Sequence, residues 1–186
     1  VGFEAFSMTQ LAKKTGLVKG TLYLYFKTRE ELFLTLYEQS LMRWSQVFIS
    51  HLSNAMTSRA YAQTLFTTAQ ADGAFLPLLI RLEHVIEHNV SIPRLIKSKQ
   101  VFKQQVETVA APTSTSLSLN AAQATEVVKT MGVLLIGATR SDQGPALDNE
   151  ALPSDVQALI ASFASEPLFV KNAVRIIEGI RAETGI

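Results

Sequence analysis

The chain has 186 residues, of which 47% are hydrophobic and 18% are charged, and its formal net charge is +1. This apolar content is enough for a buried core, which excludes a disordered or collagen-like chain. The sequence contains no cysteine, and this excludes disulfide bonds, thiolate metal sites and cysteine nucleophiles.

No membrane segment or secretory signal peptide is evident in the sequence. The longest dense apolar stretch, residues 131–138, is too short to cross a bilayer and is typical of a buried helix. We therefore expect a soluble, cytoplasmic protein that has no membrane partner.

Charge is distributed unevenly along the chain. Residues 1–29 have a local charge of +4, whereas residues 112–186 have a local charge of −3. The basic N-terminal segment is suited to phosphate groups, although a solvated basic face without a partner is the commoner explanation of such a segment when charge alone is considered.

The hydrophobic periodicity predicts an all-α fold. Apolar residues recur at spacings of three and four, and the period-two alternation of a strand is not seen. Two S/T-x-x-E/Q sequences, at residues 7–10 and 28–31, predict capped helix starts. An apolar stripe then predicts one long helix from Thr28 to about His51. Further helices are expected at residues 58–71, 76–91, 94–111, 121–140, 154–164 and 167–183.

Prolines and clusters of small polar residues mark the expected helix ends. Pro112 and the Ser/Thr cluster at residues 113–118 are expected to separate two helices, and residues 141–153 are expected to form a long loop. No flexible linker is evident, so we expect a small N-terminal module packed directly on a larger helical body.

The first helices contain the spacing of a helix-turn-helix motif. Ala12 is small enough for a close helix crossing, Gly16 permits the positive φ of a tight turn, and Leu22 can pack the second helix on the first. Many helix pairs satisfy this pattern by chance, so the triple alone is a weak indication.

The residues around the triple are more specific. The segments GFEAFSMTQLA (residues 2–12), GLVKGTLYLYFK (16–27) and EELF (30–33) closely resemble the DNA-binding segment of TetR-type transcriptional regulators. The resemblance covers about residues 1–48. It implies a helix-turn-helix DNA-binding domain at residues 1–48 and a helical effector-binding and dimerisation domain at residues 49–186.

The resemblance also implies a function. The expected protein is a homodimeric, ligand-responsive regulator, a repressor rather than an enzyme, which binds a pseudo-palindromic DNA operator and is released by a small, mostly apolar effector. No cofactor and no metal are implied. The alternative reading is a helical adaptor or scaffold whose basic N-terminus binds an acidic protein, and a small-molecule enzyme is a more distant third.

Two features depart from the family pattern. Val18 stands where the family usually has a serine, so the second helix of the motif lacks a side-chain N-cap. The family also has a helix ahead of the position that matches Gly2, and this sequence starts at Val1. We therefore expect the DNA-binding domain to be incomplete at its N-terminus.

The expected DNA contacts lie around the second helix of the motif. Its first residues and its tyrosine hydroxyls are suited to phosphate oxygens, and Thr21 can touch a base edge or a thymine methyl. The alternative for the aromatic residues is a small core, and we assign Leu22 and Phe26 to that role. The expected DNA-binding residues are Thr9, Lys19, Gly20, Thr21, Tyr23, Tyr25 and Lys27.

The pairs Glu83-His84 and Glu87-His88 have the i, i+4 spacing of helical metal ligands. No third ligand or nucleophile accompanies them, so a polar face or pocket rim is preferred to a metal site or an acid–base pair. Asn89 falls on the apolar side of the helix predicted at residues 76–91 and is interpreted either as a buried packing residue or as an effector contact.

An effector pocket, which the resemblance implies, is expected between the long helix after Thr28 and the following helices. The candidate residues are mostly apolar, as pocket linings are, and each of them can equally be a core residue. The expected effector-binding residues are Trp44, Phe48, Phe66, Phe75, Leu79, Asn89, Phe102 and Met131.

The dimer interface is expected on the helices at residues 121–140 and 167–183. Residues 131–138 are apolar on every side, Gly132 and Gly137 favour close approach, and a second apolar stripe begins at Phe169. A four-helix bundle between two chains would bury these surfaces, and the alternative is a core within one chain. The expected interface residues are Met131, Leu134, Leu135, Phe169, Ala173, Ile176, Ile177 and Ile180.

Overall fold

The computed structural model describes residues 6–141 and 152–183, apart from the side chains of Glu83 and His84. These residues form α-helices joined by short connections, and no strand occurs within them, which confirms the predicted all-α class. The helices are α1 (Met8–Thr15), α2 (Lys19–Tyr25), α3 (Arg29–Ser50), α4 (Ser58–Ala71), α5 (Phe75–Arg81), α6 (Ile92–Leu117), α7 (Ala121–Ser141), α8 (Ser154–Ser162) and α9 (Ser165–Ala182).

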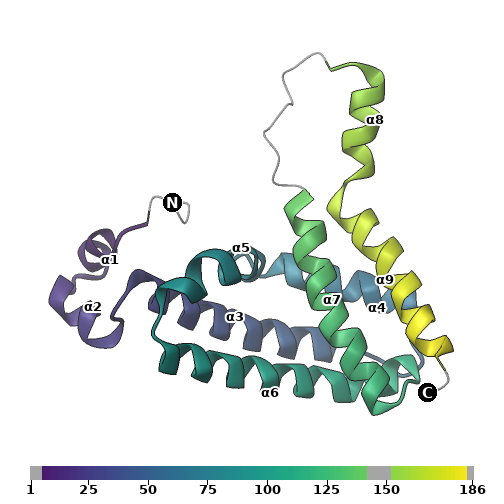
Figure 1. Ribbon diagram of the computed structural model, residues 1–186, viewed down its shortest axis with the longest axis horizontal. Helices are drawn as coiled ribbons and strands as arrows, with labels where there is room; N and C mark the ends of the chain where they lie inside the picture. The colour runs from purple at the N-terminus through teal and green to yellow at the C-terminus, as the bar shows by residue number, and fades with distance from the viewer. Residues whose placement is uncertain (1–5, 142–151, 184–186) are drawn as a thin grey trace.

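The helices form a small head and a larger body (Figure 1). Helices α1 and α2 make the head at one end of α3, and α6 lies alongside α3. Helix α7 packs on both α6 and α9, and α9 packs on α4, at the other end of α3. Helix α8 projects away from the body. Within the described ranges, no helix is both long and apolar enough to cross a membrane.

Both predicted helix starts are confirmed by their caps. The side chain of Ser7 accepts a hydrogen bond from the backbone N–H of Gln10 at 3.2 Å. Thr28 Oγ1 accepts from the backbone N–H of Glu31 at 3.1 Å, and Glu31 Oε2 accepts from the backbone N–H of Lys27 at 2.7 Å. These bonds satisfy N–H groups that the helix itself leaves without acceptors.

The helix-turn-helix geometry is also as predicted. Gly16 ends α1 with φ of 68°, a left-handed conformation that favours glycine. Ala12 and Leu22 are buried together with Met8 and Leu32 in a small core between α1, α2 and the start of α3. The head therefore has its own core, to which α3 contributes a residue.

The body has a second and much larger core. Phe48 of α3 meets Tyr61 of α4 edge to face, with 5.3 Å between ring centroids, and Phe66 of α4 lies 5.5 Å from Phe169 of α9. The hydroxyl of Tyr61 hydrogen-bonds Thr113 Oγ1 at 2.8 Å, and burial holds the pKa of this phenol well above its usual range. Tyr61 is therefore neutral at all physiological pH values.

The predicted break at Pro112 is wrong, because α6 continues through this proline to Leu117. Proline removes one helical hydrogen bond, but the residues after it are held by tertiary contacts. Thr113 is buried against Tyr61, and Ser114 Oγ donates to the carbonyl of Leu119 at 2.6 Å. These contacts stabilise the last turn, which local propensity alone would not favour.

The single helix predicted at residues 76–91 is wrong as well. Helix α5 ends at Arg81 and is followed by a π-helical turn, η2 (Leu82–Ile86), and a 3₁₀ turn, η3 (Glu87–Asn89). The wider turn buries Leu82 and Ile86 while Glu87 pairs with Lys99 at 2.7 Å. The other predicted helices are confirmed with bounds that differ by a few residues, and most of the predicted loop at 141–153 lies outside the described residues.

Two contacts join the head end of α3 to the neighbouring body segments. Thr28 Oγ1 donates to the backbone carbonyl of Asn89 at 3.2 Å, at the end of η3. Arg94, in the first turn of α6, donates to both carboxylate oxygens of Glu38 at 2.7 and 2.8 Å and to Thr35 Oγ1 at 3.1 Å. We call these contacts the α3 clamp, because they fix the first half of α3 against η3 and α6.

We predict that Thr28→Val will destabilise the chain by about 1 kcal/mol, because it removes both the N-cap oxygen of α3 and the bond to Asn89. Chemical denaturation measures the change in the free energy of unfolding, and amide exchange at Glu31 measures loss of the cap. Thr28→Ser retains the hydroxyl and serves as the control, with stability near that of the original chain. Equal stabilities of the valine and serine variants would contradict this role.

Candidate functional site

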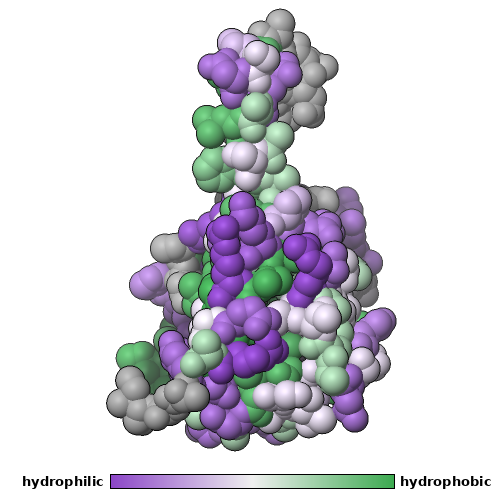
Figure 2. Space-filling model, turned by 90° about the vertical axis from the view of Figure 1, so that its right-hand side faces the viewer, coloured by the Kyte–Doolittle hydropathy of each residue, from purple (hydrophilic) through white to green (hydrophobic). Residues whose placement is uncertain are grey.

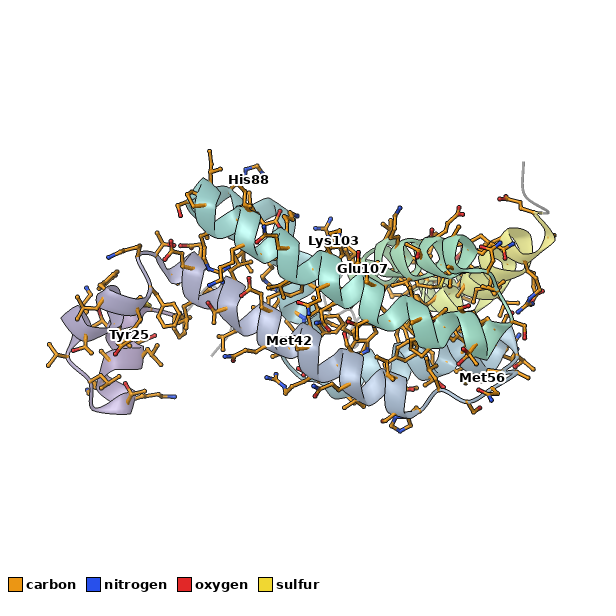
Figure 3. The ribbon with its side chains drawn as sticks, turned by 90° about the horizontal axis from the view of Figure 1, so that it is seen from below. Tyr25, Met42, Met56, His88, Lys103 and Glu107 are labelled. Carbon is orange, nitrogen blue, oxygen red and sulfur yellow. The ribbon has the colours of Figure 1, made fainter. Side chains whose placement is uncertain are left out.

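The head exposes most of the predicted DNA-binding residues, while the predicted core residue Leu22 is buried and Phe26 packs partly buried against the head core. Leu22 is 6% exposed, whereas Tyr25 is 75% exposed and lies on the head, far from most of the body (Figure 3). Tyr23 is partly exposed and Thr21 is half-buried. Exposed positions are also occupied by Thr9, Lys19, Gly20 and Lys27.

The head surface carries cations that no described acidic group neutralises. Lys13, Lys14, Lys19 and Lys27 are exposed and form no ion pair with any described residue. Lys19 Nζ lies 5.8 Å from the centroid of the Tyr23 ring, so this ring and a cation share one surface. Such a surface is suited to a polyanion.

Val18 occupies the N-cap position of α2 and forms no side-chain cap, as the sequence predicts. Its side chain is 74% exposed and apolar. The start of α2 therefore presents an apolar side chain where a serine would present a hydroxyl group.

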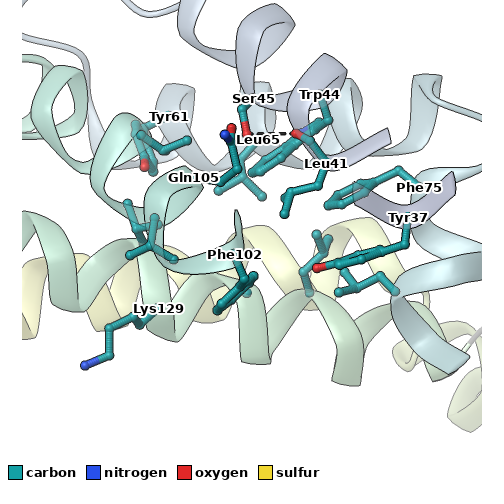
Figure 4. Close-up of a pocket in the computed structure, with 16 residues that line it drawn as sticks. Tyr37, Leu41, Trp44, Ser45, Tyr61, Leu65, Phe75, Phe102, Gln105 and Lys129 are labelled. Carbon is teal, nitrogen blue, oxygen red and sulfur yellow. Dashed lines mark hydrogen bonds between the residues drawn. The ribbon is translucent and has the colours of Figure 1, made fainter. Parts of the chain in front are cut away.

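A cavity lies in the body between α3, α5, α6 and α7 (Figure 4). Its volume is about 70 Å³. Among the predicted effector residues, Trp44, Phe75, Leu79 and Phe102 line it. The rest of the lining is formed by Tyr37, Leu41, Ser45, Tyr61, Leu65, Gln105, Val106, Val109, Val128, Lys129, Gly132 and Leu135.

A second cavity, of about 260 Å³, shares Tyr37, Leu79, Phe102, Lys129 and Gly132 with the first. Residues from η2, η3, α6 and α7 complete its wall, including the ion pair of Glu87 with Lys99. The two cavities are therefore neighbouring parts of one hollow region, and their shared wall is largely aromatic and aliphatic.

The other predicted effector residues do not line either cavity. Phe48, Phe66 and Met131 are fully buried core residues, because they pack between helices of the same chain. Asn89 is exposed, its side-chain Nδ2 donates to the carbonyl of Val85 at 2.7 Å, and its backbone belongs to the α3 clamp. Because a 3₁₀ turn stands here instead of the predicted α-helix, Asn89 does not lie on the apolar side with the buried residues.

Sequence reasoning missed Tyr37, Gln105 and Lys129. Tyr37 lies seven residues before Trp44 on α3, so helical periodicity places both on one face and could have found it. Gln105 and Lys129 are polar residues on otherwise ordinary helices, and only the packing of α6 against α7 brings them to the cavity.

The His and Glu pairs do not form a metal site within the described residues. Glu87 pairs with Lys99, and His88 is exposed and points away from the body (Figure 3). The side chains of Glu83 and His84 lie outside the described residues. In the part of the chain that the structure describes, no group of three His, Cys, Asp or Glu side chains could hold a metal ion.

Most of the predicted dimer residues are buried within the single chain, so they are not the surface that a partner would meet. The stripes of α7 and α9 pack against each other, and α9 also packs against α4. Leu134 and Ile176 are only half-buried, and Gly137 is exposed with no atom near the position of an added Cβ. The buried residues are Met131, Leu135, Phe169, Ala173, Ile177 and Ile180.

Comparisons with known proteins agree with this architecture. A crystal structure of a TetR transcriptional regulator from Rhodococcus sp. RHA1 matches with a TM-score of 0.58 and 12% identity, over 100% of this chain and 89% of that chain. At this identity the likeness shows the fold alone. No curated protein matches the chain.

Family models account for most of the sequence. Residues 1–36 match the model of the bacterial regulatory proteins of the tetR family. Residues 38–184 match the model of the tetracyclin repressor-like C-terminal domain. The chain therefore belongs to the TetR family of transcriptional regulators, a family of helix-turn-helix DNA-binding proteins that are not enzymes.

Proposed function

We propose that this regulator is a ligand-responsive repressor, which binds a pseudo-palindromic operator as a homodimer and releases it when a small, mostly apolar effector fills the body cavities. The observation that carries the proposal is the position of α3. This helix begins at the DNA-binding head and lines the cavity through Tyr37, Leu41 and Trp44. One rigid element thus touches both sites.

In the proposed docking pose, α2 enters the major groove. Lys19, Tyr23, Tyr25 and Lys27 contact phosphates and set the position of the head, while Thr21 faces base edges. The exposed, unneutralised lysines support this pose. If the partner were an acidic protein instead of DNA, this chain would show no preference for any DNA sequence. Sequence-specific DNA binding therefore separates the two functions.

We predict that Lys27→Ala will weaken binding to all DNA sequences about equally and reduce the salt slope of binding by about 1, because one phosphate contact is lost. Thr21→Ala should instead change the preference among operator variants. Gel shifts over a range of salt concentrations, with DNA flanking the gene of this protein, measure both effects.

Lys97→Ala is the matched control, because Lys97 is exposed on α6, outside the head and the helices of the proposed dimer, and forms no ion pair with any described residue. Its DNA affinity should equal that of the original chain. Unchanged affinity of Lys27→Ala for every DNA would contradict the proposed pose.

The proposed dimer places α7, α8 and α9 of two chains together. Helix α8 buries none of its residues, and Leu159, Ile160 and Phe163 are exposed at its C-terminal end. Hydrophobic surface is visible on the projecting part of the molecule (Figure 2). A nine-residue helix is too short to be stable in water without packing, so a second surface must cover it. A second copy supplies that surface and also the second head that a palindrome requires.

We predict that Ile176→Glu will give a folded monomer with lost operator affinity, because it places a charge in the half-buried interface. The neighbouring Ile177→Glu should unfold the chain, since Ile177 is fully buried. Sedimentation and circular dichroism separate the two outcomes. Gln46→Glu, on an exposed position of α3, is the control and should remain dimeric. A dimeric Ile176→Glu with full DNA affinity would place the interface elsewhere.

The proposed switch acts through α3. An effector in the cavities contacts α3 at Tyr37 and Trp44 and also touches Leu82 and Glu87, which precede the carbonyl that Thr28 bonds. Separating these walls tilts α3 and changes the distance between the two heads. Both heads enter major grooves together only when the half-site spacing is about 34 to 36 Å or a multiple of it.

We predict that the effector binds the free protein more tightly than the operator complex, because a ligand with equal affinity for both forms shifts nothing. Titration calorimetry of the same effector, with and without saturating operator, measures the difference. Identical dissociation constants in the two titrations would rule out this switch, even if DNA binding itself is confirmed.

A further inference from the structure

The charges around the cavities are unbalanced. Among the described residues, the lining of the smaller cavity has no acidic side chain, and its one cation is Lys129 of α7. In the larger cavity Glu87 is already neutralised by Lys99 at 2.7 Å. Lys129 forms no ion pair with any described residue, so within the described lining one charge is uncompensated, and that charge is positive.

The uncompensated charge lies at the open side of the hollow region. Lys129 is exposed and belongs to both linings, and its ammonium group extends away from the aromatic side chains (Figure 4). A ligand with a buried apolar end and an anionic end at this opening would place its charge beside Lys129. Its anionic group would stay partly hydrated, which keeps the cost of desolvation small.

Three aromatic rings form one wall of the smaller cavity, and of these Tyr37 also lines the larger cavity. The Phe75 ring stacks on Trp44 at 4.9 Å with 10° between planes, and on Tyr37 at 6.3 Å with 12° between planes. These three rings form a row of nearly parallel planes, and Phe102 of α6 stands across the cavity from them (Figure 4). Aromatic ligands pack well against such surfaces, both stacked and edge to face.

The volume limits the size of the ligand. The larger cavity measures about 260 Å³ and the smaller about 70 Å³. An apolar cavity of about 150 Å³ accepts benzene, so one ring and a short substituent fit the larger space. Gln105, which is half-buried in the lining and has no hydrogen-bond partner among the described residues, offers a polar contact inside.

We propose that the hollow region binds a single-ring aromatic carboxylate, with its ring among Tyr37, Leu79 and Phe102 and its carboxylate beside Lys129. The inference rests on the proposed function, since it names the class of the effector. An aromatic amine is disfavoured because no unpaired acid in the described lining receives it and Lys129 repels it. An uncharged aromatic alcohol fits the wall but gains nothing from Lys129.

Binding can be measured without DNA in two ways. Trp44 is the only tryptophan of the chain and lines the smaller cavity, next to the proposed ligand position, so its fluorescence is one readout. Titration calorimetry of the same DNA-free chain is the second readout, because the ligand ring lies in the larger cavity, which Trp44 does not line. The probes are phenylacetate, 2-phenylethanol and 2-phenylethylamine, which share one ring and differ in charge. We expect phenylacetate to bind about five- to tenfold more tightly than the alcohol, as one partly solvated ion pair allows, and the amine to bind most weakly.

Variants of Lys129 test the assignment of the charge. Lys129→Gln should bind phenylacetate and the alcohol equally, and Lys129→Arg should keep the preference for the acid. Lys97→Gln is the control, because Lys97 is exposed on α6, lines neither cavity and forms no ion pair with any described residue. It should bind all three probes as the original chain does.

Three results would overturn the proposal: no binding of phenylacetate in either titration, equal or tighter binding of the alcohol or the amine, or a preference for the acid that survives in Lys129→Gln. Operator binding by the effector-free chain is measured separately by gel shift. Failure of the gel shift would count against the proposed repressor, whereas failure of both titrations would count against the aromatic carboxylate alone.

Discussion

The whole architecture depends on α3 belonging to two hydrophobic cores at once. Its first turns place Leu32 in the small core of the head, and Leu34, Tyr37 and Phe48 then enter the large core of the body. The helix has 22 residues and is about 33 Å long at 1.5 Å per residue. Because a packed helix moves as a rigid element, neither core can shift without moving residues of the other.

The head depends on α3 more than the body does. Among the described residues of the head, four apolar side chains form its buried core, Met8, Ala12, Leu22 and Leu32, and one of these comes from α3. The head therefore keeps its position through the cap at Thr28 and through the clamp to Asn89, both of which lie at the start of α3.

The features that depend on neighbouring residues could be predicted from the sequence. The caps at Ser7 and Thr28 and the left-handed turn at Gly16 involve neighbours within four residues, and the sequence alone located each of them. The end of α6 and the π-helical turn after α5 are decided by contacts with distant segments, such as Thr113 with Tyr61. Propensity places a break at Pro112, and tertiary packing overrides it.

The candidate site shows the same division between local and distant information. Helical periodicity identified inward-facing residues such as Trp44, Phe75, Phe66 and Ile177, but it could not tell a cavity wall from a solid core or from a subunit interface. That distinction depends on how completely the facing helix fills the space. A cavity lies beside Trp44 and Phe75, whereas Phe66 and Ile177 are fully buried in the core. No pattern within one helix records this difference.

In the proposed switch, the position of the hollow region lets a bound effector act on the head. A ligand there would lie against α3 directly and against Leu82 and Glu87, whose segment ends at the carbonyl bonded by Thr28. The second of these contacts leads to the start of α3, whose first turn also holds Leu32 in the head core. A shift that leaves the body core intact would therefore be taken up at the α3 clamp. The energy available for it is limited to the difference in ligand affinity between the two positions of α3.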